Sequence, residues 1–151
     1  MTKILLVDDS PLDVELALAA LAENNLAEDV IVCHDGEEAL DYLFCRGNFA
    51  QREKIYPRVM LLDLKMPKVD GLEVLSIIKS APELKTIPVV MLTSSKEEKD
   101  LVKSYHLGVN AYVVKPVDFH EFLEVLQKLG LFWVMINQPP PVNVNIAIDN
   151  D

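Results

Sequence analysis

Five short apolar runs, rich in β-branched residues, alternate along the chain with segments whose apolar positions recur every three or four residues. An uninterrupted apolar run of this length is typical of a strand that is buried on both faces. Regular alternation of strands and helices indicates right-handed crossovers, and hence a parallel sheet covered by helices on both sides. The predicted strands occupy residues 3–7, 30–34, 59–62, 88–92 and 111–114.

Segments of helical periodicity fill the intervals after these runs. The first helix is expected to begin at Pro11 with Ser10 as its N-cap, because Pro suits the first helical position and Ser accepts a hydrogen bond from the first turn. A third helix is expected to follow Gly71, and Gly108 is expected to end the fourth. The apolar positions that define the five helices are Val14, Ala17, Leu18 and Leu21; Leu40, Leu43 and Phe44; Leu75 and Ile78; Leu101, Val102 and Tyr105; and Phe119, Phe122, Leu123 and Leu126.

Two segments depart from this pattern. Residues 45–58 form a link longer than most connections in compact domains, and such links are often functional. Near the end of the chain, after the apolar stretch LFWVMI and three prolines, residues 142–148 alternate apolar and polar positions, a strand pattern without a partner in the sequence. That strand is a candidate for pairing with another molecule, with a disordered end as the alternative. Trp133 and its neighbours either cover the core or form a partner or dimer surface.

Composition narrows the class of protein. The 151 residues, half of them hydrophobic, fit one globular domain. A net charge of −10 argues against sequence-independent nucleic-acid binding, which relies on Lys and Arg. No apolar stretch reaches the roughly 18 residues of a membrane span, and the N-terminus lacks a signal-peptide pattern. Because Cys33 and Cys45 offer neither a disulfide framework nor metal-ligand spacing, we expect a reducing, cytoplasmic compartment.

Polar side chains stand at the carboxyl ends of four predicted strands. Asp8 and Asp9 follow the first strand, Asp63 the third, Thr93 the fourth and Lys115 the fifth. Ligands of open parallel sheets bind outside these ends, so we expect the five side chains to share one rim. Two carboxylates about 4 Å apart repel by roughly 1 kcal/mol in water and about 4 kcal/mol near a protein surface. The adjacent acids therefore indicate a site that takes a cation.

The residue types at this rim fit phosphoryl chemistry. Clustered carboxylates suit Mg²⁺, which prefers octahedral oxygen ligands. A carboxylate can also act as a nucleophile and form an aspartyl phosphate. A metal ion and a Lys ammonium can neutralise the charge of a transferring phosphoryl group, and the hydroxyl of Thr93 can donate a hydrogen bond to it.

The order of these motifs resembles that of receiver domains of two-component response regulators. The motifs are DD at residues 8–9, DLKMPKVDG at 63–71, T at 93 and KP at 115–116. The resemblance covers residues 3 to about 129 and implies a flavodoxin-like (βα)5 fold, a doubly wound parallel sheet with strand order 2-1-3-4-5. Residues 1–130 would form the receiver domain and residues 131–151 a C-terminal extension.

The resemblance also implies a role for each acid of the rim. Asp63 would accept a phosphoryl group from a sensor histidine kinase or a phosphotransfer protein. Asp8, Asp9, Asp63 and the backbone carbonyl of Lys65 would bind Mg²⁺, with Asp9 as the closer ligand of the adjacent pair. The side chain of Lys65 lies near the acceptor and is expected to tune the phosphoryl lifetime.

Four further positions have roles by resemblance. Lys115 would pair with Asp63 and the phosphoryl group, and Pro116 would follow a cis peptide bond. Thr93 would move toward the phosphoryl group and Tyr112 would change rotamer with it. These changes would alter the partner affinity of the face formed by the fourth helix, the fifth strand and the fifth helix.

The long link and the LGLFW stretch make the chain similar to stand-alone receivers that partner phytochrome-type sensor kinases. In that group the extended C-terminus tends to support dimerisation, so we expect a homodimer formed through this region. From the net charge and the lack of a long apolar stretch we expect neither a nucleic-acid partner nor a membrane partner.

Two other functions remain open from the sequence. An aspartyl-phosphate hydrolase would need a second acid two residues after its nucleophile, where this chain has Lys65. A phosphorylation-independent scaffold would not require the intact acidic set and Lys115. Ser94 and Ser95 are either neighbours of the phosphoryl group or helix caps, and for Ser95 we favour the cap.

Overall fold

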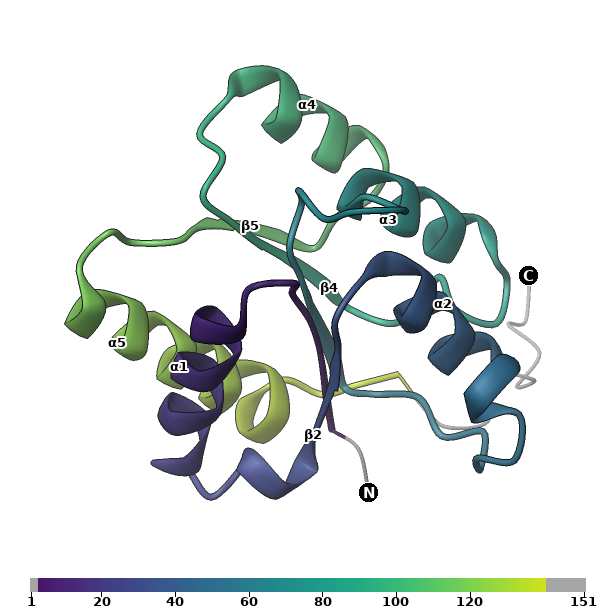
Figure 1. Cartoon of the computed structure of the whole chain (residues 1–151), viewed down its shortest axis with the longest axis horizontal. Coiled ribbons are helices and arrows are strands. Elements are labelled where there is room, and N and C mark those ends of the chain that lie inside the picture. The colour runs from purple at the N-terminus through teal and green to yellow at the C-terminus, as the bar shows by residue number, and fades with distance from the viewer. Residues whose placement is uncertain (1–2, 141–151) are drawn as a thin grey trace, which may run out of the picture.

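The centre of the molecule is a five-stranded parallel sheet in the order β2-β1-β3-β4-β5 (Figure 1). The structure is a computed structural model that describes residues 3–140. The predicted flavodoxin-like strand order is confirmed, and every predicted strand lies within one residue of an observed one. The strands are β1 Ile4–Val7, β2 Val30–Cys33, β3 Val59–Leu62, β4 Val89–Thr93 and β5 Ala111–Val114.

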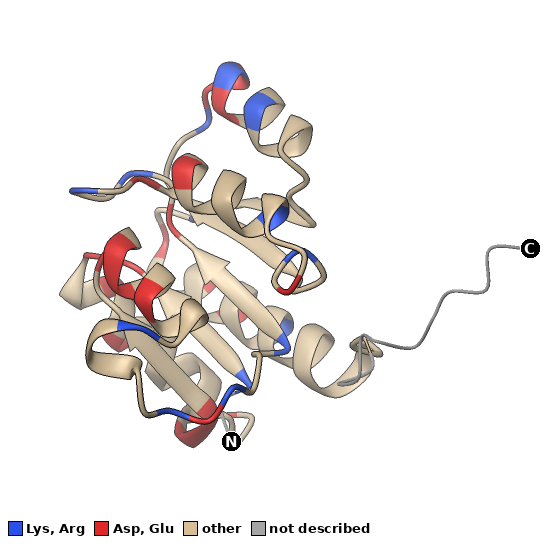
Figure 2. Ribbon diagram, turned by 90° about the vertical axis from the view of Figure 1, so that its right-hand side faces the viewer, with Lys and Arg blue, Asp and Glu red and all other residues tan. Residues whose placement is uncertain are grey.

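Both faces of the sheet are buried, which explains why the strands are apolar without interruption. In β1, Leu5 and Val7 face one hydrophobic cluster, whereas Ile4 and Leu6 face the other. Because successive side chains of a strand point to opposite faces, a strand between two helical layers needs apolar residues at every position. In Figure 2 the bodies of the strands carry neither acidic nor basic residues, which lie on helices, loops and strand ends.

Helices cover each face of the sheet (Figure 1). The helices α1 (Pro11–Ala22) and α5 (Phe119–Gly130) supply side chains to one cluster, and α2 (Gly36–Phe44) and α3 (Gly71–Ser80) to the other. The helix α4 (Glu98–His106) contacts α3, and Gly108 follows it with a φ of 98° as expected for a helix stop. Three short helices lie between or after these elements, namely η1 Ala27–Asp29, η2 Gly47–Phe49 and η3 Leu131–Ile136.

Helix starts at the carboxyl edge of the sheet are fixed by local side chains. Ser10 caps α1 as predicted, because its hydroxyl accepts a hydrogen bond from the Asp13 amide. Gly71 begins α3 where the chain passes very close to the end of β3. A Cβ atom at Gly71 would lie 2.3 Å from the carbonyl oxygen of Asp63, so only glycine fits without moving the backbone. This close approach helps to fix the position of Asp63.

The start of α4 differs from the prediction. Ser95 is not its N-cap, because Glu97 holds that position and makes no side-chain cap. The Ser95 hydroxyl instead donates a 2.6 Å hydrogen bond to the buried carboxylate of Asp100 and accepts one from the Glu97 amide at 3.3 Å. A buried carboxylate needs hydrogen-bond partners, so Ser95 turns toward Asp100.

The link formed by residues 45–58 is packed against the core. The guanidinium of Arg52 lies 3.9 Å from the ring centroid of Tyr42, and its Nε donates a 2.6 Å hydrogen bond to the Tyr42 carbonyl. Phe49 and Tyr56 also contact the core cluster beside α2 and α3. The length of this link therefore reflects a structured segment.

The chain continues beyond α5 as η3, a π-helical turn. Val134 is buried, Trp133 packs against the same cluster, and Arg58 donates a 2.7 Å hydrogen bond to the Val134 carbonyl. Trp133 and Val134 therefore cover the core. The opposite side of this segment is apolar and exposed, and its role as a partner or dimer surface stays a prediction. The exposed set is Leu131, Phe132, Met135 and Ile136. The predicted strand at 142–148 lies outside the described residues.

Candidate functional site

Three carboxylates meet at the carboxyl edge of the sheet. Asp8, Asp9 and Asp63 place ligand atoms within 4.8 Å of one another. The register explains this meeting, because Val7 of β1 pairs with Leu62 of β3 and the acids follow directly. Asp8 is 3% exposed and Asp63 is 9% exposed, whereas Asp9 is exposed to solvent. The two adjacent acids are therefore not equivalent.

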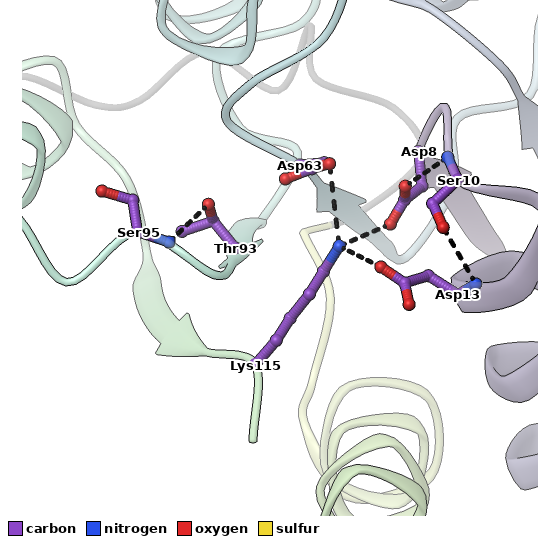
Figure 3. A network of polar contacts seen from close by, with 7 residues as sticks. All are labelled: Asp8, Ser10, Asp13, Asp63, Thr93, Ser95 and Lys115. Carbon is purple, nitrogen blue, oxygen red and sulfur yellow. Dashed lines mark hydrogen bonds and ion pairs between the residues drawn. The ribbon is translucent and has the colours of Figure 1, made fainter. Parts of the chain in front are cut away.

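Lys115 reaches into this cluster from the end of β5 (Figure 3). Its Nζ lies 2.8 Å from Asp8 Oδ2, 2.8 Å from Asp13 Oδ2 and 3.6 Å from Asp63 Oδ2. Burial disfavours the charged ammonium, but the hydrogen bonds to Asp13 and Asp8 and the charge of Asp63 outweigh it, so the pKa of Lys115 is raised. Lys115 therefore remains a cation at neutral pH.

Asp63 lies at the centre of the site. Burial raises its pKa to about 6, against the opposing effect of Lys115, and the charges of Asp8 and Asp9 add to the rise. Burial is thus the main cause of the raised pKa, and the crowding of negative charge that the sequence predicts adds to it. A bound cation would offset the part of this rise in pKa that comes from Asp8 and Asp9.

Asp13 is the residue of this site that sequence reasoning missed. It lies in the first turn of α1, where acids are common because they interact favourably with the helix N-terminus. That ordinary explanation conceals its contact with Lys115, which comes from a strand about a hundred residues later. The sequence did contain one indication of this contact. Because Ser10 caps α1, the helix begins directly at the carboxyl edge of the sheet, and its first turn lies near the ends of the strands.

Thr93 stands at the end of β4, on the side of Asp63 away from Asp8 (Figure 3). Its hydroxyl accepts a 3.2 Å hydrogen bond from the Ser95 amide. The hydroxyl of Tyr112 donates a 3.0 Å hydrogen bond to the Ser95 carbonyl. Ser95 therefore contacts both predicted switch residues as well as Asp100, a connection that the sequence did not indicate.

Lys65 lies at the margin of the site. Its ammonium is 3.9 Å from a carboxylate oxygen of Glu97, and both side chains are largely exposed. This pair connects the loop after β3 with the loop after β4. The role of the Lys65 carbonyl as a metal ligand stays a prediction.

The predicted cis bond before Pro116 is wrong for this structure. No peptide bond among residues 3–140 is cis, so the Lys115–Pro116 bond is trans. The trans form of a bond before proline is favoured by about 0.5–1 kcal/mol. The trans bond leaves Lys115 within reach of Asp8, Asp13 and Asp63.

The donor set fits a hard divalent cation. Three carboxylates converge, and the ligands that they offer are all oxygen, as Mg²⁺, Mn²⁺ and Ca²⁺ prefer. Neither histidine nor cysteine belongs to this group of the described residues. The arrangement combines three clustered carboxylates, two of them buried, with an ammonium held by ion pairs and a hydroxyl on one rim.

A family model for the response regulator receiver domain matches residues 4–127. The chain belongs to this family. It is thus a phosphoacceptor domain of two-component signalling, of a family whose members bind a divalent cation at an acidic pocket and are phosphorylated by histidine kinases.

Three relatives make the kinship more specific. Response regulator Rcp1 of Synechocystis sp. is 39% identical over 131 residues, which is 87% of this chain and 88% of Rcp1. The crystal structure of its Mn(2+)-bound form has a TM-score of 0.86 at 37% identity and covers 93% of this chain and 100% of that chain. The phosphorylated cyanobacterial phytochrome response regulator RcpA has a TM-score of 0.86 at 39% identity, with 93% and 99% covered. The bacteriophytochrome response regulator RtBRR is 58% identical, with a TM-score of 0.73 and coverage of 93% and 86%. The predicted resemblance to stand-alone receivers of this group is confirmed.

Proposed function

We propose that Asp63 accepts a phosphoryl group from a phosphohistidine of a sensor kinase or phosphotransfer protein, and that this reaction requires Mg²⁺. The observation that carries the proposal is the convergence of Asp63 with Asp8, Asp9 and Lys115. Asp63 shares a 4.8 Å cluster with the two acids and lies 3.6 Å from the Lys115 ammonium. Asp63 is buried beside the two acids and the lysine, an arrangement that suits a nucleophile whose phosphorylation needs positive charge nearby.

In the proposed reaction a carboxylate oxygen of Asp63 attacks the phosphorus atom. An O–P bond forms, the N–P bond of the phosphohistidine breaks, and its electron pair returns to the imidazole. Lys115 holds its ammonium beside the incoming phosphoryl oxygens, and Thr93 offers a hydroxyl to one of them. Bound Mg²⁺ would supply the remaining positive charge. Asp63 ends as an acyl phosphate, so the protein is a stoichiometric acceptor and does not turn over substrate.

We assign the cation ligands to Asp8, Asp9, Asp63 and the backbone carbonyl of Lys65. Three of them are supported by the cluster of carboxylate oxygens, and the fourth by its place two residues after Asp63. Mg²⁺ keeps several waters and needs few protein ligands, which suits a site where Asp9 is open to solvent.

The switch would act through the contacts of Ser95. When Thr93 turns to a phosphoryl oxygen, its hydrogen bond with the Ser95 amide breaks, and the tether from Tyr112 to the Ser95 carbonyl loosens with it. A shift in this equilibrium changes the face of α4, β5 and α5. This face carries exposed apolar side chains that a partner can cover, namely Leu101, Val102, Tyr105 and Phe119.

We infer that the partner kinase is of the phytochrome type, because relatives with this description cover nearly the whole chain. We also infer a homodimer through residues 131–151, supported by the exposed apolar side of η3. A nucleic-acid partner is not expected at a net charge of −10. The free thiols of Cys33 and Cys45 support a cytoplasmic location. Among residues 3–140 no helix has the length and apolar character that a membrane crossing requires.

The test is phosphorylation with acetyl phosphate and Mg²⁺, followed by intact mass measurement. The wild type should gain one phosphate per chain, and Asp63→Asn should gain none. Glu83→Gln, which removes an exposed acid elsewhere, should behave like the wild type. Labelling of Asp63→Asn at the wild-type rate would contradict the assignment, and release of more than one equivalent of product from a phosphomonoester would favour a hydrolase.

A further inference from the structure

Lys115 has two equally short ion pairs, and one of them lies outside the carboxylate cluster. Its Nζ is 2.8 Å from Asp13 Oδ2 and 2.8 Å from Asp8 Oδ2 (Figure 3). The group of described residues whose ligand atoms converge consists of Asp8, Asp9 and Asp63, and Asp13 is not among them. Asp13 therefore contacts the lysine of the site without belonging to the candidate cation site.

The position of Asp13 in the first turn of α1 does not account for this contact. An acid three residues after an N-cap often reaches back to the amide of that cap. Here the Ser10 amide already donates a 2.9 Å hydrogen bond to Asp8 Oδ1, and Ser10 caps the Asp13 amide with its own hydroxyl. Helix capping is thus carried out by Ser10 and Asp8, while the Asp13 carboxylate points to Lys115 (Figure 3).

The two partners of Lys115 differ in what happens when a cation binds. Asp8 is a candidate ligand, so a divalent cation competes with the ammonium for its oxygens. Asp13 keeps its oxygens available to Lys115. A lysine side chain is flexible and carries about 2 kcal/mol of rotamer entropy, so it stays fixed only while it has a partner.

We propose that Asp13 is a positioning residue for phosphoryl transfer, because its carboxylate keeps the Lys115 ammonium beside Asp63 when Asp8 turns to the cation. This inference rests on the proposed function of Asp63 as the acceptor. Asp13 acts through Lys115 and does not touch the reacting atoms. It orients the one side-chain cation of the site among the described residues, before the phosphoryl group arrives.

The principal test is Asp13→Asn, assayed by the rate of phosphorylation with acetyl phosphate and Mg²⁺. We expect the maximal rate to fall about tenfold, which corresponds to ~1.4 kcal/mol of activation free energy. Asp13→Glu should restore most of the rate, because the carboxylate returns. Asp29→Asn is the matched control, since it removes an acid that pairs with Lys3 at 3.5 Å, before β1 at the opposite edge of the sheet, and it should leave the rate unchanged.

Two further measurements separate positioning from a structural role of Asp13. In a Lys115→Met background, Asp13→Asn should cause no additional slowing, because its partner is gone. In the metal-free protein, solvent exchange of the Lys115 ammonium protons, followed by side-chain NMR, should become several-fold faster in Asp13→Asn.

A wild-type rate for Asp13→Asn, or equal slowing in the Lys115→Met background, would overturn the inference. If the wild type itself gained no phosphate at Asp63, the proposed function would fail. The ammonium exchange measurement would still decide whether Asp13 holds Lys115.

Discussion

The ammonium of Lys115 lies 2.8 Å from Asp8 Oδ2, and Asp8 is also a candidate ligand of the divalent cation. One carboxylate thus faces two positive groups that cannot share its oxygens equally. Cation binding and the position of Lys115 are therefore coupled. The lysine that assists phosphoryl transfer also opposes cation binding.

From this coupling we predict that Lys115→Met binds Mg²⁺ or Mn²⁺ at least tenfold more tightly than the wild type does, which corresponds to about 1.4 kcal/mol of binding free energy. The same variant should be phosphorylated more slowly. The variant removes a positive charge from the site and releases Asp8. Calorimetric titration of the metal-free protein measures the affinity. Lys3→Met, which removes a lysine at the opposite edge of the sheet, should not change it. Weaker cation binding in Lys115→Met would contradict the competition.

The raised pKa of Asp63 predicts a pH-dependent stability in the metal-free protein. Its folded pKa of about 6 lies above the ordinary value of 3.8. The folded state therefore binds the proton more tightly than the unfolded state, and its stability falls as pH rises from 3.8 to about 6. A shift of about two pKa units corresponds to roughly 3 kcal/mol.

Asp63→Asn cannot ionise and should escape this loss. In the metal-free protein we expect it to raise the melting temperature by roughly 6–12 °C at pH 8, given about 2–4 °C per kcal/mol for a chain of this size. At pH 4 the two proteins should melt close together. Thermal unfolding followed by circular dichroism at both pH values measures the difference. An equal difference at the two pH values would show that ionisation of Asp63 is not its cause.

The sheet and most of the rim could be predicted from the sequence, for a physical reason. Strands that are buried on both faces leave uninterrupted apolar runs, and parallel pairing brings their carboxyl ends to one edge. Asp8, Asp63 and Lys115 are therefore placed by topology alone. Their separation in sequence does not matter once the strand order is known.

The residues that the sequence could not place depend on three-dimensional contacts. Asp13 resembles an ordinary first-turn acid until the fold brings the start of α1 to Lys115, which follows β5. Ser95 resembles a helix cap, but the buried carboxylate of Asp100 attracts its hydroxyl. The bond before Pro116 was predicted from family resemblance and is trans here.

The Ser95 hydroxyl should contribute measurably to stability. Ser95→Ala leaves the buried Asp100 carboxylate without its 2.6 Å hydrogen bond. Loss of a hydrogen bond to a charged group costs about 1.5–3 kcal/mol. Chemical denaturation measures the change in the free energy of unfolding. Ser94→Ala is the control, because Ser94 is the exposed neighbour, and it should change stability by less than about 0.5 kcal/mol. If the two variants lowered the free energy of unfolding equally, the hydrogen bond from Ser95 to Asp100 would not be the cause of the loss.

The exposed side of η3 tests the proposed dimer. Phe132 and Met135 are 45% and 62% exposed, whereas Val134 on the other side of the same turn is buried. The double change Phe132→Ser and Met135→Ser therefore alters the proposed interface while the Val134 contact and the Arg58 hydrogen bond remain. We expect light scattering to give the mass of a dimer for the wild type and that of a monomer for the double variant. Leu12→Ser, which changes an exposed apolar residue of α1, should remain dimeric. The dimer would be contradicted if the wild type were monomeric both with and without acetyl phosphate and Mg²⁺. If the double variant stayed dimeric, the interface would lie elsewhere on the molecule.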